Sequence, residues 1–328
     1  MKFFFALILF FVLCCSPSRA DIVNGQNYVP LGDWARANGF HMALHGQEID
    51  LTGKTSRLVF SVNSAAAQIN GVNVRLSFPV ADIKGVPLIA QFDLNSAVSP
   101  LLFPSDYAGH EKITTICLDP GHGGKDTGNR VHTFFWHDEK TYTLALALEL
   151  RRQLEGAGFK VILTRAQDVY VDLPARPAMA NKAGADLFIS LHFNAAPTDP
   201  QNVEGPETYC ITPVGANSSN AEGGEFGSKV GDGPTIANRC EDKSLLLAYQ
   251  IQKSLVQNLN ANDRGVKRAR FAVLRDAEMP AILIEGGFMT NPAEGRKIFS
   301  AVYRKQMAAA IVKGILAYQK LAEPLAKK

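Results

Sequence analysis

Residues 113–124 read Ile-Thr-Thr-Ile-Cys-Leu-Asp-Pro-Gly-His-Gly-Gly. The apolar run over residues 113–118 predicts a short buried strand, and the chain leaves it through Asp119, a proline and a glycine. His122 follows, with a glycine on each side. Glycine lets the backbone turn tightly and leaves room for another group to approach. The stretch therefore predicts a strand that presents a histidine at its carboxyl end.

Strands and helices alternate on the carboxyl side of this stretch. A helix is expected over residues 139–154, because apolar residues share one of its faces and two glycines follow it. Further helices are expected over residues 173–183 (capped by Asp172), 243–259 and 293–321, strands over 160–164, 187–191, 272–274 and 281–284, and a loop rich in Gly, Ser and Asn over 214–237. This alternation predicts the α/β class, with a layered domain over residues 111–322 whose largely parallel central sheet is flanked by helices.

A small β-rich domain is expected before it, over residues 21–108. Its expected elements are strands over residues 58–62 and 72–78, a short helix over 31–38 and a linker over 102–110. The segments 28–31, 35–40, 69–72 and 79–80 resemble the small module at the N-terminus of copper amine oxidases. This resemblance implies an accessory domain without copper chemistry.

The first twenty residues predict a secretory signal peptide that is cleaved after Ala20. Lys2 precedes an apolar run over residues 3–15, and small residues stand before the cut, as a signal peptidase requires. The run is too short to span a bilayer comfortably. An uncleaved membrane anchor and a lipid anchor on Cys14 or Cys15 are the alternatives. The mature protein is expected to be exported to the periplasm or cell envelope, with no membrane span.

The composition indicates a folded globular protein and gives no sign of nucleic-acid binding. Apolar residues make up 46% of the chain and charged residues 20%, which is typical of a folded globular protein. A net charge of +3 does not predict nucleic-acid binding, for which a clustered basic patch is expected. Cys117 lies in an apolar run and predicts a buried thiol. Cys210 and Cys240 flank a loop and could either form a disulfide or stay free.

Three of the expected strands end in residues that can carry chemistry. His122 follows the first, His192 ends a run that begins at Ile189, and Glu285 ends the buried strand near the carboxyl terminus. The fold brings such strand ends to one edge of the sheet, where ligands bind in open α/β proteins. Glu139 begins a helix after a loop that is long enough to return it to the same edge. We therefore expect these four side chains to meet.

Two histidines and one carboxylate are a ligand set for catalytic zinc, with the fourth position left to water. His122, Glu139 and His192 are the candidate ligands of one Zn²⁺. Zinc lowers the pKa of bound water to about 7. Glu285 then fits a general base that takes a proton from water and passes it to a leaving nitrogen.

Each of these residues taken singly has a simpler interpretation. A histidine at a strand end is commonly a hydrogen-bonded structural residue, and a glutamate that starts a helix complements the helix dipole. A glutamate after a strand is often half of an ion pair, and the candidate partners of Glu285 are Arg165, Arg176 and Arg275. The combination at matching places in the fold favours a single metal site.

Four motifs stand in order along the chain. They are Leu-Asp-Pro-Gly-His-Gly-Gly-Lys-Asp (118–126), Asp-Glu-Lys (138–140), Ala-Asp-Leu-Phe-Ile-Ser-Leu-His-Phe-Asn (185–194) and Pro-Ala-Ile-Leu-Ile-Glu-Gly-Gly-Phe-Met-Thr-Asn (280–291). In this order they resemble the zinc-dependent N-acetylmuramoyl-L-alanine amidases. The resemblance implies that His122, Glu139 and His192 bind zinc and that Glu285 is catalytic. It also implies peptidoglycan as the substrate, cut at the amide bond between N-acetylmuramic acid and L-alanine.

The resemblance leaves alternatives open. The aromatic stretch over residues 130–137 carries His132 and His137, either of which could replace Glu139 as a ligand. Some members of the family carry a helix after the third motif that blocks the cleft until an activator removes it. The loop-like stretch over residues 215–238 predicts no such stable helix. A zinc peptidase that cuts the stem peptide and a wall-binding protein without catalysis are the alternative functions.

Overall fold

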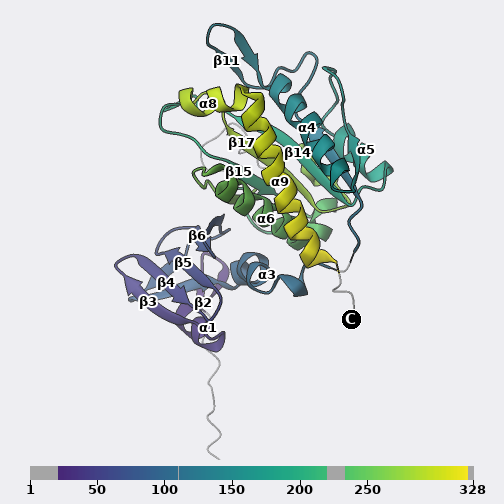
Figure 1. The fold of residues 1–328 in the computed structure, drawn as a ribbon. Helices are drawn as coiled ribbons and strands as arrows, with labels where there is room; N and C mark the ends of the chain where they lie inside the picture. Colours follow the sequence, from purple (N-terminus) through teal and green to yellow (C-terminus); the bar gives the residue numbers. More distant parts are fainter. Residues whose placement is uncertain (1–20, 110, 220–232, 324–328) are drawn as a thin grey trace, which may run out of the picture.

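The structure is a computed structural model that describes residues 21–109, 111–219 and 233–323. The predicted signal peptide and its alternative anchors lie outside these residues. Within them, no helix has both the length and the apolar character needed to cross a membrane. Figure 1 shows a β-rich N-terminal part and a larger part in which helices cover a sheet.

One sheet of eleven strands runs through the chain. In spatial order, its strands are β13 (Lys160–Leu163), β10 (Thr115–Pro120), β14 (Leu187–Asn194), β17 (Ala281–Phe288), β15 (Glu207–Cys210), β16 (Val266–Arg268), β7 (Val72–Arg75), β6 (Ala66–Ile69), β5 (Arg57–Ser61), β4 (Glu48–Thr52) and β3 (His41–His45). The strands from β13 to β16 pair in parallel, except that β15 is antiparallel to β17. This arrangement confirms the predicted α/β class with a largely parallel sheet.

Two apolar cores cover the two faces of the α/β part. Ile116 and Leu118 belong to one core and Cys117 to the other, because successive residues of a strand point to opposite faces. The first core is closed by three helices that lie side by side (Figure 1), α4 (Glu139–Gly156), α9 (Ala301–Ala322) and α6 (Glu241–Leu259). The second core is closed by α5 (Ala175–Lys182) and α7 (Ala272–Arg275). The carboxyl ends of the parallel strands emerge between these layers.

The N-terminal part adds a second, four-stranded sheet and short helices. The sheet runs in the order β1 (Asp21–Val23), β2 (Gln26–Pro30), β9 (Val86–Ala90) and β8 (Ala81–Ile83), and the helices are α1 (Leu31–Ala37), α2 (Gln91–Asp93), η1 (Leu94–Val98), α3 (Ser99–Leu102) and η2 (Pro104–Asp106). The predicted helix over residues 31–38 and the predicted strands at 58–62 and 72–78 match α1, β5 and β7, although β7 ends at Arg75. Strand β7 pairs in parallel with β16, so strands from both predicted domains share one sheet.

Three predicted elements differ from the structure. Residues 272–274 form the helix α7 and no strand, because an apolar run this short has no periodicity that separates the two. The predicted helix over residues 293–321 is two helices, α8 (Pro292–Phe299) and α9, separated by extended backbone at Ser300. Asp172 does not cap α5, whose N-cap position is Pro174.

Of the two alternatives for Cys210 and Cys240, the structure shows free thiols and no disulfide between them. Cys210 ends β15 and contacts the carbonyl of Lys267, whereas Cys240 ends η3 (Ile236–Cys240) and contacts the carbonyl of Glu278. Cys117 is buried as predicted, and burial raises the pKa of its thiol to about 12. Most of the predicted loop over residues 214–237, and with it the question of a blocking helix, lies outside the described residues.

Candidate metal centre

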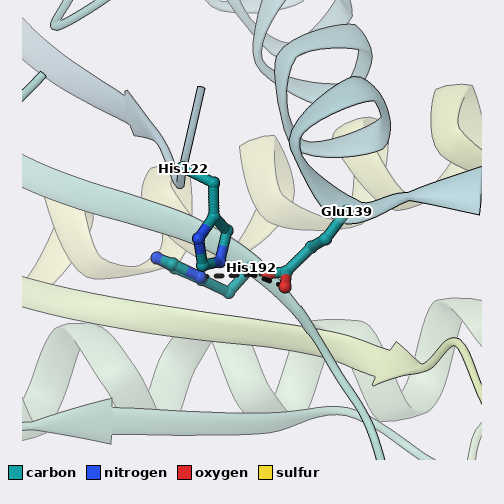
Figure 2. Close-up of side chains that lie close together, drawn as sticks. All are labelled: His122, Glu139 and His192. Carbon is teal, nitrogen blue, oxygen red and sulfur yellow. Dashed lines mark hydrogen bonds and ion pairs between the residues drawn. The ribbon is translucent and has the colours of Figure 1, made fainter. Parts of the chain in front are cut away.

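The structure brings His122, Glu139 and His192 together at the edge of the sheet. One potential ligand atom from each lies within 4.8 Å of the others. His122 Nε2 is 3.1 Å from Glu139 Oε2, and His192 Nδ1 is 3.1 Å from Glu139 Oε1. Figure 2 shows the two imidazoles facing the carboxylate, from the loop after β10, from β14 and from the start of α4. Within the described chain, this is the group of His, Cys, Asp and Glu side chains that can hold a metal ion.

Glycines make room for the two imidazoles, as the sequence suggests. His122 itself has a left-handed backbone with φ of 62°. A Cβ atom at Gly121 would lie 2.3 Å from the His192 ring, and one at Gly128 would lie 2.5 Å from the His122 ring and 2.6 Å from Glu139 Oε2. Side chains at these two positions would therefore occupy the space of the candidate ligands.

Two buried arginines hold the loop that carries His122. Arg165 donates to the carbonyls of Pro120 and Gly121, and Arg176 donates to the carbonyls of Pro120 and His122. Both side chains are almost fully buried. The sequence suggested these arginines only as candidate ion-pair partners of Glu285 under its simpler interpretation, and neither forms such a pair in the described chain. Both arginines donate to backbone carbonyls of another segment, and a single sequence does not indicate such contacts.

Asp119, near the end of β10, anchors the same loop. Its carboxylate is fully buried and pairs with Arg176 at 2.8 Å. The hydroxyl groups of Thr164 and Ser190 donate to its two oxygen atoms at 2.6 and 2.7 Å. Since every oxygen has a partner, the buried charge is compensated. Thr164 directly after β13, Asp119 in β10 and Ser190 in β14 are thus fixed to one another.

A carboxylate orients the first imidazole. His122 Nδ1 is 2.9 Å from Asp126 Oδ2, which leaves Nε2 directed at Glu139. Such a carboxylate–histidine contact fixes the ring and its tautomer in metal sites. Burial lowers the pKa of His122, but the hydrogen bonds and charges of Glu139 and Asp126 outweigh it and raise this pKa.

Glu139 is held as a carboxylate at the start of α4. Its oxygens accept the backbone N–H groups of Asn129 and Phe193 at 2.9 and 3.0 Å. Burial would raise its pKa, but the hydrogen bonds with His122 and His192 outweigh burial and hold the pKa far below its usual range. An ionised carboxylate between two imidazoles is the form in which glutamate binds a cation.

The two competing histidines lie elsewhere. His137 is bonded to Thr133 and Tyr142, and its ring stacks on Phe299 with centroids 3.8 Å apart. His132 packs against the ring of Trp136 in the hairpin of β11 (Arg130–His132) and β12 (Trp136–Asp138). Neither belongs to the group of possible metal ligands, so Glu139 keeps that position.

Glu285 lies beside the metal centre on β17. It is the register partner of His192 on β14 and of Glu207 on β15, so the three side chains share one face of the sheet. Its Oε2 atom is buried and has no hydrogen-bond partner among the described residues. Burial, together with the charges of Glu139 and Glu207, raises the pKa of Glu285 well above its usual value. No arginine forms an ion pair with it in the described chain.

Sequence reasoning missed Glu207, which lies next to Glu285. Its carboxylate is buried and accepts from Asn194, from the Tyr209 hydroxyl, from Arg264 at 3.0 Å and from Lys267. Glu207 lies close to Glu285, and it can stay ionised there because Lys267 and Arg264 outweigh the effect of burial and lower its pKa. The run of Thr, Tyr and Cys after Glu207 has the β-branched and aromatic residues typical of a strand, so the strand β15 could have been predicted from the sequence.

Comparison with known proteins identifies the family. A family model described as N-acetylmuramoyl-L-alanine amidase matches residues 116–317. The chain belongs to this amidase family. Its members typically depend on a metal, and the His–Glu–His group provides a site for one. The predicted family resemblance is thereby confirmed, whereas the identity of the metal and the origin of the N-terminal part stay predictions.

Individual amidases of known sequence or structure resemble the same region. N-acetylmuramoyl-L-alanine amidase AmiC of Neisseria meningitidis is 37% identical over 220 residues, covering 62% of this chain and 52% of that protein. LytC of Bacillus subtilis is 34% identical, covering 62% of this chain and 35% of LytC. The crystal structure of an N-acetylmuramoyl-L-alanine amidase from Clostridium difficile 630 matches with a TM-score of 0.51 at 32% identity, over 64% of this chain and 98% of that chain. The chain thus spans about half or less of these two sequence relatives.

Proposed function

We propose that the protein is a zinc-dependent amidase that hydrolyses the bond between N-acetylmuramic acid and L-alanine in peptidoglycan. The observation that carries this proposal is the juxtaposition of a His–Glu–His group with Glu285 on the adjacent strand. Family membership supports the bond and the substrate. The rest follows from what these side chains can do.

His122, Glu139 and His192 would hold the zinc ion. Two imidazole nitrogens and one carboxylate are a donor set that zinc prefers, with a fourth position open. The space kept by Gly121 and Gly128 and the ionised state of Glu139 support this fit. When bound, zinc supplies Lewis acidity toward an amide carbonyl and toward water.

Glu285 would move the proton. Among the described residues its Oε2 has no hydrogen-bond partner, and it lies on the face that also carries His192, beside the candidate ligands. Burial and the charges of Glu139 and Glu207 make it a stronger base than an exposed glutamate. It can therefore accept a proton from water and donate it to the leaving nitrogen.

Digestion of purified peptidoglycan by the zinc-loaded protein tests the function. We expect new L-alanine amino groups and unchanged glycan lengths. The matched variant is Glu285→Gln, which keeps the shape of the side chain; it should retain zinc and lose activity by at least about a hundredfold. New ends confined to the stem peptide would instead identify a peptidase. Binding to the wall without hydrolysis would identify a wall-binding protein.

The predicted domain organisation and location complete the proposal. Residues 1–20 would act as an export signal, residues 21–108 as an accessory part and residues 111–322 as the catalytic domain in the periplasm or cell envelope. Sequencing the N-terminus of the exported protein tests the first of these, with Asp21 as the expected first residue. An intact Met1 or a lipid on Cys14 or Cys15 would replace this with an anchor.

A further inference from the structure

Three neighbouring aromatic side chains lie exposed at the end of the hairpin formed by β11 and β12. Phe134 is 95% exposed, Phe135 74% and Trp136 60%. Figure 1 shows this hairpin, labelled at β11, projecting from the α/β part of the fold. Consecutive exposed apolar residues are unusual in a folded protein, and a patch of them rimmed by polar residues marks a binding site. The proposed catalysis makes no use of residues 130–138, which we call the aromatic hairpin.

The fold holds the aromatic hairpin in one position. Val131 packs against the core that α4, α9 and α6 close, and the ring of its register partner His137 stacks on Phe299 with centroids 3.8 Å apart. His137 is also hydrogen-bonded to the hydroxyl of Thr133, at 2.9 Å, and to that of Tyr142. These contacts join the hairpin to α4 and α8, so its exposed rings are in place before a ligand arrives.

The opposite face of the hairpin carries polar groups around an aromatic ring. Arg130 is the register partner of Asp138. His132 is the register partner of Trp136. Both pairs alternate with the anchored pair, so their side chains lie on the other face. The guanidinium of Arg130 lies 4.7 Å from the centroid of the Trp136 ring and pairs with Asp138 at 2.8 Å, and the His132 ring lies 4.8 Å from Trp136 between centroids.

The base of the hairpin is part of the candidate metal centre. The backbone N–H of Asn129 donates to Glu139 Oε2 at 2.9 Å, and the N–H of Glu139 donates to the Asn129 carbonyl at 2.9 Å. The Asn129 side chain donates to the carbonyl of Phe193, which directly follows His192. Trp136 stands three residues before Glu139, a separation of at most about 10 Å along extended backbone. A substrate whose amide bond lies at the metal centre therefore has its neighbouring groups next to this face.

The chemistry of this face favours a sugar polymer. The scissile amide joins the stem peptide to a sugar, so the glycan strand must pass beside the metal centre. A sugar ring has an apolar face and a rim of hydroxyl groups, which match an aromatic ring flanked by polar side chains. A membrane-binding segment instead combines apolar residues with an excess of cations. The aromatic hairpin has one arginine and one aspartate, and these pair with each other.

We propose that the aromatic hairpin binds the glycan strand of peptidoglycan beside the sugar whose amide bond is cut. The proposal rests on the proposed function and extends it to substrate recognition. Trp136 would stack on the apolar face of a sugar ring, and Phe134 and Phe135 would extend this contact along the strand. Glycan strands should accordingly bind even after their stem peptides have been removed.

The fluorescence of Trp136 tests this binding directly. The chain has two tryptophans, so Trp34→Phe leaves Trp136 as the reporter. We expect peptide-free glycan strands, added to the zinc-loaded variant, to change the emission of Trp136 until the site is saturated. Vesicles of phosphatidylglycerol should leave the emission unchanged. No change with the strands would overturn the proposal, and a change with the vesicles alone would overturn it in favour of a membrane contact.

A second substitution locates the binding on the hairpin. Phe134→Ser, added to Trp34→Phe, should raise the dissociation constant for the strands by about fivefold, because an aromatic contact is lost. Its side chain is almost fully exposed, so the fold should be kept. The control Ile22→Ser removes an apolar side chain of β1 that is 75% exposed, and it should leave the dissociation constant unchanged. Equal dissociation constants for Phe134→Ser and the control would contradict the proposal.

The two proposals fail in different ways, because these titrations involve no hydrolysis. Release of stem peptides by a protein that does not bind the strands would contradict the role of the aromatic hairpin alone. Binding of the strands by a protein that releases no stem peptide would contradict the proposed function alone.

Discussion

At the scale of single residues, the candidate metal centre depends on a glycine whose lack of a Cβ atom leaves space for two of the ligands. Gly128 combines a φ of +62° with the closest approach to two candidate ligands, His122 and Glu139. Alanine at this position would strain the backbone and push both ligands apart. The precision of the site therefore depends on a residue without a side chain.

Gly128→Ala should lower zinc affinity by at least about tenfold, because metal ligands must keep their mutual geometry to within fractions of an ångström. Zinc content after dialysis against a weak chelator measures this effect. The control is Gly156→Ala in the last turn of α4, where a Cβ atom would meet nothing within 4 Å. Retention of zinc by Gly128→Ala to the same extent as by the control would show that the loop can relax.

The buried pair of Arg176 and Asp119 gives a prediction on stability. Arg176→Ala leaves Asp119 as an uncompensated buried charge and frees the carbonyls of Pro120 and His122. Loss of about 3–5 kcal/mol in the free energy of unfolding is expected. The exposed pair of Arg152 and Glu149 is the control, and Arg152→Ala should cost far less, because solvent screens this pair. Urea unfolding of both variants makes the comparison, and similar costs would refute the anchoring role.

At the scale of elements, the carboxylate of Asp93 joins α2 to the chain after β7. It accepts the backbone N–H groups of Ser77 and Phe78 at 2.7 and 2.9 Å. Burial outweighs these hydrogen bonds and raises its pKa from 3.8 to about 6. The folded protein thus binds a proton between pH 4 and pH 6 that the unfolded chain releases.

Stability from this group should be complete below about pH 4 and be lost as the pH rises through 6, since the raised pKa belongs to the folded state. The expected slope is up to about 1.4 kcal/mol per pH unit. Asp93→Asn, which cannot titrate, should lack this component. Urea unfolding from pH 4 to pH 7 tests the difference between the two proteins, and parallel curves would contradict the assignment.

The sequence could predict the site residues that stand at the ends of strands or at the start of a helix. His122, His192 and Glu285 were found because each follows an apolar run, and the structure brings them together with Glu139 as expected. The supporting roles of Arg165 and Arg176 were missed because their acceptors come from distant segments, and Glu207 was missed because its strand β15 was not predicted. The apolar run in α7 was too short to have a period, and nothing in the composition around Ser300 indicated a helix break.

At the scale of the whole molecule, the pairing of β7 with β16 was beyond reach of the sequence. It rests on a single register pair, Val74 with Val266, and on contacts such as those of Asn73 with Asp263. Neither strand is distinctive in composition. Its consequence is that the N-terminal part is continuous with the rest of the fold and should share its stability.

We therefore expect residues 21–323 to unfold in one transition. The chain has two tryptophans, Trp34 in α1 and Trp136 in β12, so Trp136→Phe leaves Trp34 as a reporter of the N-terminal part alone. Its fluorescence and the helical circular dichroism, which is dominated by α4, α6 and α9, should change at the same denaturant concentration. An earlier midpoint for Trp34 would mean that the two parts unfold separately.

The shared sheet also sets an order of events during synthesis. Asn73 precedes its partner Asp263 by 190 residues, which a ribosome adds in about 10–40 s. Throughout that interval β7 is an open sheet edge, and such edges pair readily with other chains. In the newborn chain, strand β7 is therefore exposed to aggregation until β16 has been synthesised.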